Sequence, residues 1–395
     1  DHHAEPTSTC GDTRSRNGPG MIIFDDVTFT YAGAKHPTLE KVNLEIVEGE
    51  LALVLGETGS GKSTFLRLMN GLVPHFTGGN LRGSVIMNGR DTATHPPREL
   101  ADLIGMVPQD PLASFVSDTV EEELAYTMEC LGVDGAAMRK RVEETLDLLG
   151  IASLRRRPVT TLSGGERQRV AIGAVMTAHP KILILDEPTS ALDPGAAEEV
   201  LATLQRLVHD LGVTVVIAEH RLERVIEYAD QIIALERREP QTSAHILQGK
   251  PAGIMRDSTL APPVVRLGRL VNWNPLPLSI RDARRSAAGL RSLLSGKSPH
   301  VRSVPNEPKV AARIQAGVVV YGPAIALRNV DFELYSGTIT ALMGRNGAGK
   351  STLLNSIVGL VQLSGGVVHV DGVDPPTTSA SKLMRHVGLL SLIHI

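Results

Sequence analysis

The stretch "LALVLGETGSGKSTFLRLMN" (51–70) decides the fold of this protein. A β-rich apolar run (51–55) comes first, and a helix-forming run follows the glycine-rich segment. Residues 56–63 fit the pattern G-x-x-x-x-G-K-[ST], whose glycines let the backbone turn tightly and point its N–H groups inward. The amino end of the following helix adds positive potential. The stretch therefore predicts a phosphate-binding loop between a strand and a helix of an α/β domain.

This pattern assigns two side chains directly. Lys62 is expected to reach the β- and γ-phosphates of a nucleotide, and the Ser63 hydroxyl is expected to hold Mg²⁺. The residues predicted to contact the nucleotide here are Gly56, Glu57, Thr58, Gly59, Ser60, Gly61, Lys62, Ser63 and Thr64.

The same stretch occurs a second time, as "ITALMGRNGAGKSTLLNSIVGL" (339–360). A tyrosine precedes each copy, and "GSVIMNGRD" (83–91) is matched by "GVVHVDGVD" (366–374). This self-similarity predicts a complete domain over 21–240 and the N-terminal part of a second copy over 311–389. The second loop should again follow a strand, "ITALM", with Ser351 on Mg²⁺. Its predicted nucleotide contacts are Gly344, Arg345, Asn346, Gly347, Ala348, Gly349, Lys350, Ser351 and Thr352.

The stretch "KILILDEPTSALD" (181–193) begins with an apolar run, which two acidic residues, Asp186 and Glu187, follow directly. The run is typical of a buried parallel strand, and ligands of open α/β sheets bind beyond the carboxyl ends of such strands. Asp186 is therefore expected to bind Mg²⁺ directly or through water. Glu187 points elsewhere and is expected to polarise the water that attacks the γ-phosphate, as a general base.

Just before that strand lies "TLSGGERQRVAIGAVMTAHP" (161–180), which resembles the signature of ABC-type ATPases. The resemblance implies an α/β P-loop NTPase domain with a mixed sheet and a helical signature subdomain. It also implies head-to-tail pairing of two such domains. Signature residues Ser163, Gly164, Gly165 and Glu166 then serve the nucleotide of the partner domain, from the amino end of a helix.

Other positions match further elements of that family in order. Tyr31 and Tyr321 match the aromatic residue that stacks on adenine. Gln109 in "MVPQDP" matches the glutamine that senses the γ-phosphate, binds Mg²⁺ and couples to membrane partners. Asp193 in "SALD" matches the loop at the domain interface, and His220 in "VTVVIAEHR" matches the switch histidine.

A narrower resemblance comes from "NGLVPHFTGG" (70–79), "SDTVEEELAYTMECLGV" (117–133) and "AEHRLERV" (218–225). These stretches look like energy-coupling-factor (ECF) transporter ATPases, in which two fused ATPase domains also occur. That resemblance implies ATP-driven uptake of a vitamin or a transition-metal ion. The partners it implies are a membrane-embedded coupling subunit, a membrane-embedded substrate-binding subunit, and a second ATPase domain in cis or in trans.

Three alternatives come from other classes of ABC protein. They are a soluble ATPase with two ABC domains that acts on ribosomes, an ABC ATPase that acts in DNA repair, and the ATPase of another transporter type. Ribosome-acting members usually join their domains by a long, charged helix, whereas residues 241–310 are rich in Pro, Gly and Arg and are predicted to be a linker. DNA-repair members carry a coiled-coil insertion between phosphate loop and signature, and here only about a hundred residues separate Lys62 from Ser163.

Charge and hydropathy bear on the partners of this protein and on its location in the cell. The formal net charge of −3 is not that of a nucleic-acid binder, so no nucleic-acid partner is expected. No run approaches the length of a membrane span, and the first twenty residues have no hydrophobic centre of a signal peptide. We expect a peripheral protein on the cytoplasmic face of the plasma membrane.

We have a hypothesis for each end of the chain, residues 1–20 and residues 390–395. Residues 1–20 contain no Met and are expected to be a disordered or non-native leader before Met21. At the other end the two copies agree up to about Leu389, and Leu392 stands where the second copy should have the equivalent of Gln109. Residues 390–395 ("LSLIHI") look like a translated adapter sequence, so the second domain is expected to be truncated. A chain of this kind would bind ATP but turn over poorly alone.

Overall fold

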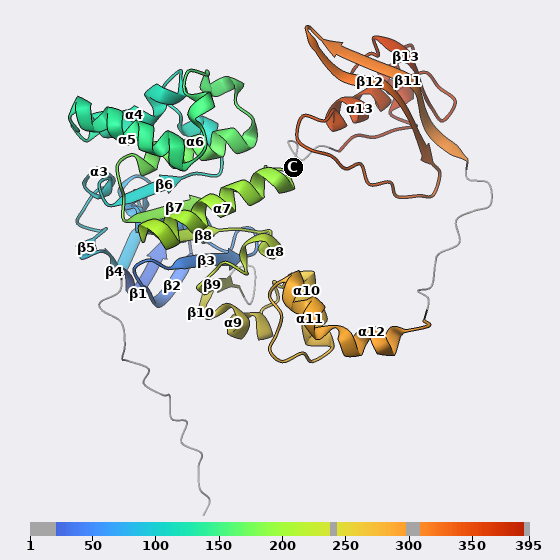
Figure 1. The fold of residues 1–395 in the computed structure, drawn as a ribbon. Helices are drawn as coiled ribbons and strands as arrows, with labels where there is room; N and C mark the ends of the chain where they lie inside the picture. Colours follow the sequence, from blue (N-terminus) through green and yellow to red (C-terminus); the bar gives the residue numbers. More distant parts are fainter. Residues whose placement is uncertain (1–20, 238–242, 298–308, 391–395) are drawn as a thin grey trace, which may run out of the picture. The chain divides into compact units, whose positions relative to one another are not determined.

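The computed structural model describes residues 21–237, 243–297 and 309–390. The chain forms two compact units, residues 1–293 and 294–395, which are described separately below as the first and second units (Figure 1). The predicted leader (1–20) and residues 391–395 of the predicted adapter segment lie outside the described residues.

A six-stranded sheet is the centre of the first unit, with strand order β10-β9-β3-β8-β7-β6. All neighbouring pairs are parallel except β10 with β9, so the sheet is mixed, as predicted. Its strands are β3 (Leu51–Gly56), β6 (Ile104–Val107), β7 (Ile182–Asp186), β8 (Thr214–Ala218), β9 (Gln231–Glu236) and β10 (His245–Gly249).

Both faces of this sheet are covered, which explains the continuous apolar runs in its strands. Along β3, Leu53 packs into a core shared with the helices, whereas Val54 packs into a second core on the other face. The second core is closed by an antiparallel sheet of order β2-β1-β4-β5. Its strands are β1 (Ile22–Thr30), β2 (Leu39–Ile46), β4 (Asn80–Met87) and β5 (Arg90–Asp91).

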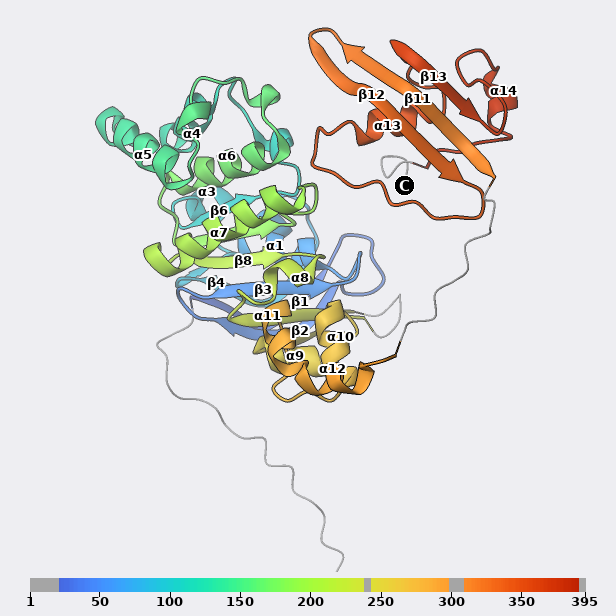
Figure 2. The same ribbon diagram turned by 45° about the vertical axis from the view of Figure 1, so that its right-hand side comes forward.

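Helices and short 3₁₀ turns connect these strands. In both ribbon views α4, α5 and α6 form a group of their own, which is the helical subdomain that the family resemblance implied (Figures 1 and 2). The helices up to residue 225 are α1 (Lys62–Met69), α2 (Leu72–His75), α3 (Pro97–Leu100), α4 (Val120–Cys130), α5 (Gly135–Leu148), α6 (Gly164–Met176), α7 (Pro194–Leu211) and α8 (Leu222–Val225). The 3₁₀ turns are Pro111–Ser114, Ala152–Leu154 and Val159–Thr161.

The predicted linker (241–310) contains regular structure. Four short helices lie within it: α9 (Pro251–Asp257), α10 (Pro263–Leu270), α11 (Ile280–Ser286) and α12 (Ala288–Leu294). Met255 and Val265 are fully buried in the helix-side core of the first unit. The prolines that suggested a linker stand at the first turns of α9 and α10, where the missing N–H has no cost.

The second unit repeats part of this plan. Its sheet has the order β12-β11-β13 and is antiparallel, as are β2-β1-β4 in the first unit. Gly83 and Gly366 have φ of 78° and 83°. At each, a Cβ would lie within 2.5 Å of carbonyl oxygens of the neighbouring strand, so only glycine fits. The elements are β11 (Val310–Tyr321), β12 (Ala324–Tyr335), α13 (Lys350–Ile357), β13 (Gly365–Val370) and α14 (Ala380–Leu383).

The predicted strand "ITALM" (339–343) is not formed in the structure. Ile339 and Met343 are exposed, by 102% and 87%. In the first unit the equivalent β3 pairs with β8 on one side and β9 on the other. The described part of the second unit has no counterpart of β8 or β9, so this apolar run has neither hydrogen-bond partners nor a core to enter.

Candidate active site

The predicted site residues of the first unit gather at one edge of the six-stranded sheet. Parallel strands point their carboxyl ends to the same edge, so the residues that follow them converge there. The phosphate loop follows β3, Gln109 follows β6, Glu187 follows β7, and His220 follows β8. Asp186 is the last residue of β7 and is 9% exposed.

The phosphate loop closes on its own lysine. Lys62 is the first residue of α1 and is 6% exposed. Its Nζ donates to the backbone oxygens of Gly56 at 2.8 Å and Glu57 at 3.0 Å. Burial lowers the pKa of Lys62, and the carboxylates of Glu187 and Asp186 partly offset that effect. The ammonium group therefore stands between the loop carbonyls and the acidic end of β7.

The second phosphate loop has the same internal contacts. Lys350 Nζ donates to the backbone oxygens of Gly344 at 2.8 Å and Arg345 at 2.7 Å, and Lys350 begins α13. Although its preceding strand is missing, the loop thus has the lysine geometry of the first copy. Tyr321, at the end of β11, is 51% exposed.

Tyr31 lies beside the first phosphate loop. Its hydroxyl is 2.9 Å from Oγ1 of Thr64 on α1, and its ring meets Phe29 edge-on with centroids 4.8 Å apart. The structure therefore places the predicted adenine-stacking residue against the helix that begins at Lys62.

The carboxylate of Glu187 contacts two other predicted site residues, His220 and Gln109. Glu187 Oε1 lies 2.6 Å from His220 Nε2, and Gln109 Nε2 donates to Glu187 Oε2 at 3.1 Å. The Glu187 side chain is 14% exposed. Its backbone has φ of 51°, in the left-handed region that a non-glycine residue rarely adopts. Three residues distant in sequence thus meet at one group.

Glu219 is a residue of this site that the sequence analysis did not single out. It is 1% exposed, and its Oε1 accepts the N–H of Thr189 at 2.7 Å. Burial raises the pKa of this carboxyl. A signal was present in the sequence, because an acid between a buried strand and His220 must end at the ligand-binding edge of the sheet.

The signature residues cap α6 rather than contact the phosphate loop. Ser163 is the N-cap of α6, and Glu166 Oε2 accepts the Ser163 N–H at 2.7 Å, so the two form a capping box. A Cβ on Gly165 would lie 2.8 Å from Ala196 Cβ, so glycine is needed for α6 to approach α7. Asp193 caps α7, accepting the Ala196 N–H at 3.1 Å.

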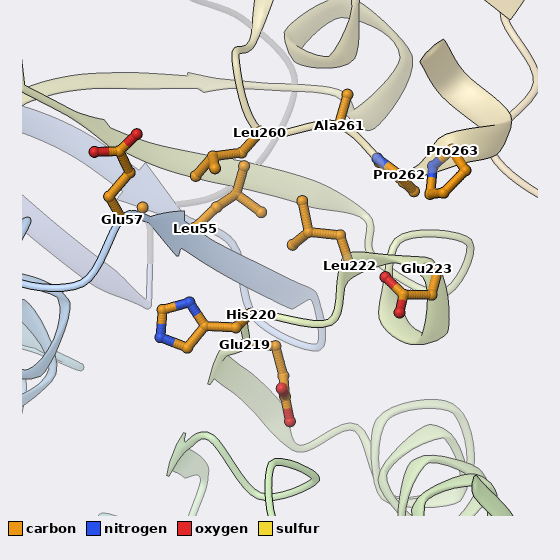
Figure 3. A pocket seen from close by; sticks show the side chains of 11 residues that line it. Leu55, Glu57, Glu219, His220, Leu222, Glu223, Leu260, Ala261, Pro262 and Pro263 are labelled. Carbon is orange, nitrogen blue, oxygen red and sulfur yellow. The ribbon is translucent and has the colours of Figure 1, made fainter. Parts of the chain in front are cut away.

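A pocket of about 200 Å³ adjoins this edge (Figure 3). Gly56 and Glu57 of the phosphate loop line it, together with His220, Glu219 and residues 260–263, where α10 begins. The helices beyond β10 therefore reach the neighbourhood of the phosphate loop. Figure 3 also shows that His220 and Glu219, although adjacent, point in different directions.

Over 21–237, 243–297 and 309–390, no cluster of three or more His, Cys, Asp or Glu side chains could hold a metal ion. In the same ranges no helix has the length and apolar character needed to cross a membrane.

Comparisons with known proteins place the chain in one family. The model of the ABC transporter family matches residues 39–190 and 327–392. An ABC transporter ATP-binding protein of Streptomyces avermitilis is 54% identical over 397 residues, which cover 94% of this chain and 70% of the relative. One of Methanosarcina mazei is 33% identical over 398 residues, covering 94% of this chain and 66% of the relative.

Solved structures agree with this assignment. CbiO1 from Clostridium perfringens, part of the ABC transporter complex CbiONQ, matches with a TM-score of 0.54 and 28% identity. The match covers 65% of this chain and 100% of CbiO1. The ATP-binding cassette MJ0796, in a dimeric post-hydrolysis state with ADP and phosphate, matches with a TM-score of 0.50 and 28% identity, covering 58% of this chain and 99% of that one. The chain therefore belongs to the ATP-binding proteins of the ABC transporter family, which bind ATP with Mg²⁺ and hydrolyse it.

Proposed function

We propose that this chain is the ATP-hydrolysing subunit of an ECF-type importer. In this role it drives uptake of a vitamin or a transition-metal ion through separate membrane-embedded coupling and substrate-binding subunits, from the cytoplasmic face of the membrane. The observation that carries the hydrolytic part is the meeting of Gln109 and His220 on the carboxylate of Glu187, beside the buried Lys62.

Lys62 is proposed to bind the β- and γ-phosphates. In the structure its three donors are directed partly at loop carbonyls, so the ammonium group is already oriented at the mouth of the loop. Its burial means that the positive charge is poorly hydrated, and an incoming phosphate then offers a stronger partner than the two neutral carbonyls. The glycines of the loop add backbone N–H donors around the same phosphates.

Glu187 is proposed to be the general base. Water attacks the γ-phosphorus, the bond from that phosphorus to the bridging oxygen of ADP breaks, and the proton of the water passes to Glu187. Both oxygens of this carboxylate have partners in the structure, namely His220 and Gln109. We propose that the γ-phosphate takes over one of these partners, which frees one oxygen of Glu187 for the water.

The side chains at the loop suit Mg²⁺, which prefers oxygen ligands and retains several waters. Ser63 supplies a hydroxyl and Asp186 a carboxylate. Gln109 uses its Nε2 on Glu187, which leaves its amide oxygen for another partner. When bound, the ion would neutralise part of the phosphate charge.

The nucleotide at Lys62 is proposed to need the signature of a second ATPase domain. In the first unit Ser163 and Glu166 form the amino end of α6 and bond to each other, and the amino end of a helix carries a partial positive charge that favours anions. We propose that they serve a nucleotide held at the phosphate loop of a second ATPase domain. The dimeric post-hydrolysis state of the MJ0796 cassette supports pairing as a general arrangement.

The importer type rests on similarity. CbiO1, which this chain matches over the full length of that protein, is part of a transporter complex. The stretches 70–79, 117–133 and 218–225 carry the sequence likeness to ECF-type ATPases. The antiparallel sheet of the second unit and its phosphate loop favour a second copy of the ATPase domain, an arrangement that also occurs in that group.

Replacing the proposed base tests the hydrolytic assignment. Glu187→Gln keeps the hydrogen-bonding shape but cannot accept the proton, so we expect ATP binding to persist while hydrolysis falls by about 100-fold or more. Steady-state ATPase rates and ATP titrations measure the two quantities. Glu129→Gln, at an exposed position near the end of α4, is the control and should leave both unchanged. A normal hydrolysis rate in Glu187→Gln would show that another group is the base.

Removing the proposed phosphate-binding lysine tests the cradle. Lys62→Ala should weaken ATP binding at the first unit by about 10-fold or more, because a buried charge-assisted contact is worth over 1 kcal/mol. A Lys350→Ala background isolates the first site, and titration calorimetry measures the affinity. Lys181→Ala, at the opposite end of β7, serves as the control. Unchanged affinity in Lys62→Ala would count against this site.

Fractionation of cells tests the importer against the ribosome-acting alternative. We expect the tagged chain to co-purify with integral membrane proteins from solubilised membranes, because transport requires membrane-embedded subunits. Sucrose-gradient sedimentation of the same lysate measures ribosome association. Sedimentation with ribosomes, together with no membrane partner, would overturn the importer proposal and leave the ATPase assignment intact.

A further inference from the structure

Glu219 is a buried carboxyl group for which the hydrolytic scheme above has no role. It follows β8 directly, and only 1% of it is exposed. Its own N–H lies 3.4 Å from the backbone oxygen of Val54 on β3, the strand that leads into the phosphate loop. The residue thus lies between the strand before the loop and the turn after β7.

The side chain of Glu219 bonds to that turn. Its Oε1 accepts the N–H of Thr189 at 2.7 Å, and Thr189 is completely buried. A second bond lies next to this one, because the N–H of Glu187 donates to the backbone oxygen of Ala218 at 2.9 Å. The turn at residues 187–189 is therefore fastened to residues 218–219 at both of its ends.

These two hydrogen bonds are significant because the backbone at Glu187 is strained. Its φ of 51° is in the left-handed region, which a residue with a side chain keeps only when its surroundings enforce it. Glu219 supplies one of those restraints through its hydrogen bond to Thr189, which lies two residues after Glu187. His220, the residue after Glu219, supplies another through its contact with the Glu187 carboxylate.

The buried N–H of Thr189 needs an acceptor at this position. Thr189 is completely buried, and Glu219 Oε1 accepts its N–H at 2.7 Å. An apolar side chain of similar size would fill the same space but would leave that backbone donor without this acceptor, which is costly in a buried position.

We propose that Glu219 is a positioning residue for ATP hydrolysis. Through the N–H of Thr189 it fixes the turn from which Glu187 reaches the attacking water, and it keeps that turn in register with His220. This inference rests on the proposed role of Glu187 as the base. It assigns Glu219 no contact with nucleotide or water.

Three substitutions separate the hydrogen bond from the packing. Glu219→Gln keeps an acceptor oxygen at Oε1, so its kcat should stay within about 3-fold of the native value. Glu219→Leu fills similar space without an acceptor, and Glu219→Asp retracts the carboxyl group by one carbon. Because small misplacements of catalytic groups are costly, both should lower kcat by about 10- to 100-fold. The KM for ATP should change by less than about 3-fold, since Lys62 and the loop are untouched.

Glu123→Leu is the matched control. Glu123 is 5% exposed, and its Oε2 accepts the N–H groups of Val116 and Ser117 at 2.9 and 2.8 Å, so it is also a buried carboxyl that binds backbone. It should lose thermal stability comparably to Glu219→Leu but keep its kcat. Thermal unfolding and ATPase kinetics are measured on all variants of the full chain, and Glu219→Asp serves if Glu219→Leu does not fold.

The outcomes distinguish this inference from the proposal on which it rests. Normal kcat in Glu219→Leu or Glu219→Asp, with Glu187→Gln inactive, overturns the role of Glu219 and leaves the base in place. Equal loss of kcat in Glu219→Gln and Glu219→Leu also overturns it, because then the acceptor is not what is needed. An active Glu187→Gln refutes the base itself.

Discussion

The common direction of the parallel strands is the constraint on which the rest of the structure depends. Strands β3, β6, β7 and β8 all end at one edge of the six-stranded sheet. The lysine, glutamine, glutamate and histidine of the site come from positions up to about 160 residues apart. A buried sheet with both faces covered holds those strand ends in register, so chemistry at the edge needs only short loops.

Most of that edge was predictable from the sequence. The phosphate loop, the strand ending at Asp186 and the helix capped by Ser163 each have a local signal, and each is found where it was predicted. The order of motifs along the chain gave the family, and the family gave the mixed sheet and the helical subdomain. What the sequence could not give was the pairing of Glu187 with both Gln109 and His220, since that depends on side-chain directions across three strands.

The failures have physical causes. Residues 241–310 were predicted to be a linker because proline, glycine and arginine are frequent there. Within that range, however, prolines stand at helix starts, and the fully buried Met255 and Val265 pack into the core of the first unit. The run at 339–343 has the composition of a core strand, but a strand needs neighbours, and the described second unit provides none. Glu219 was not predicted as a site residue because its proposed role depends on one hydrogen bond to Thr189, which is distant in sequence. Local patterns predict elements well, whereas they do not predict what those elements touch.

We propose that ATP is bound and hydrolysed at the edge formed by Lys62, Glu187, Gln109 and His220. A crystal structure of the full chain with Mg²⁺ and a non-hydrolysable ATP analogue tests it most directly. We predict that Lys62 Nζ leaves the carbonyls of Gly56 and Glu57 for the β- and γ-phosphates, and that a water lies between the γ-phosphate and Glu187. A nucleotide bound elsewhere, or a Glu187 carboxylate with no water between it and the γ-phosphate, would contradict the account.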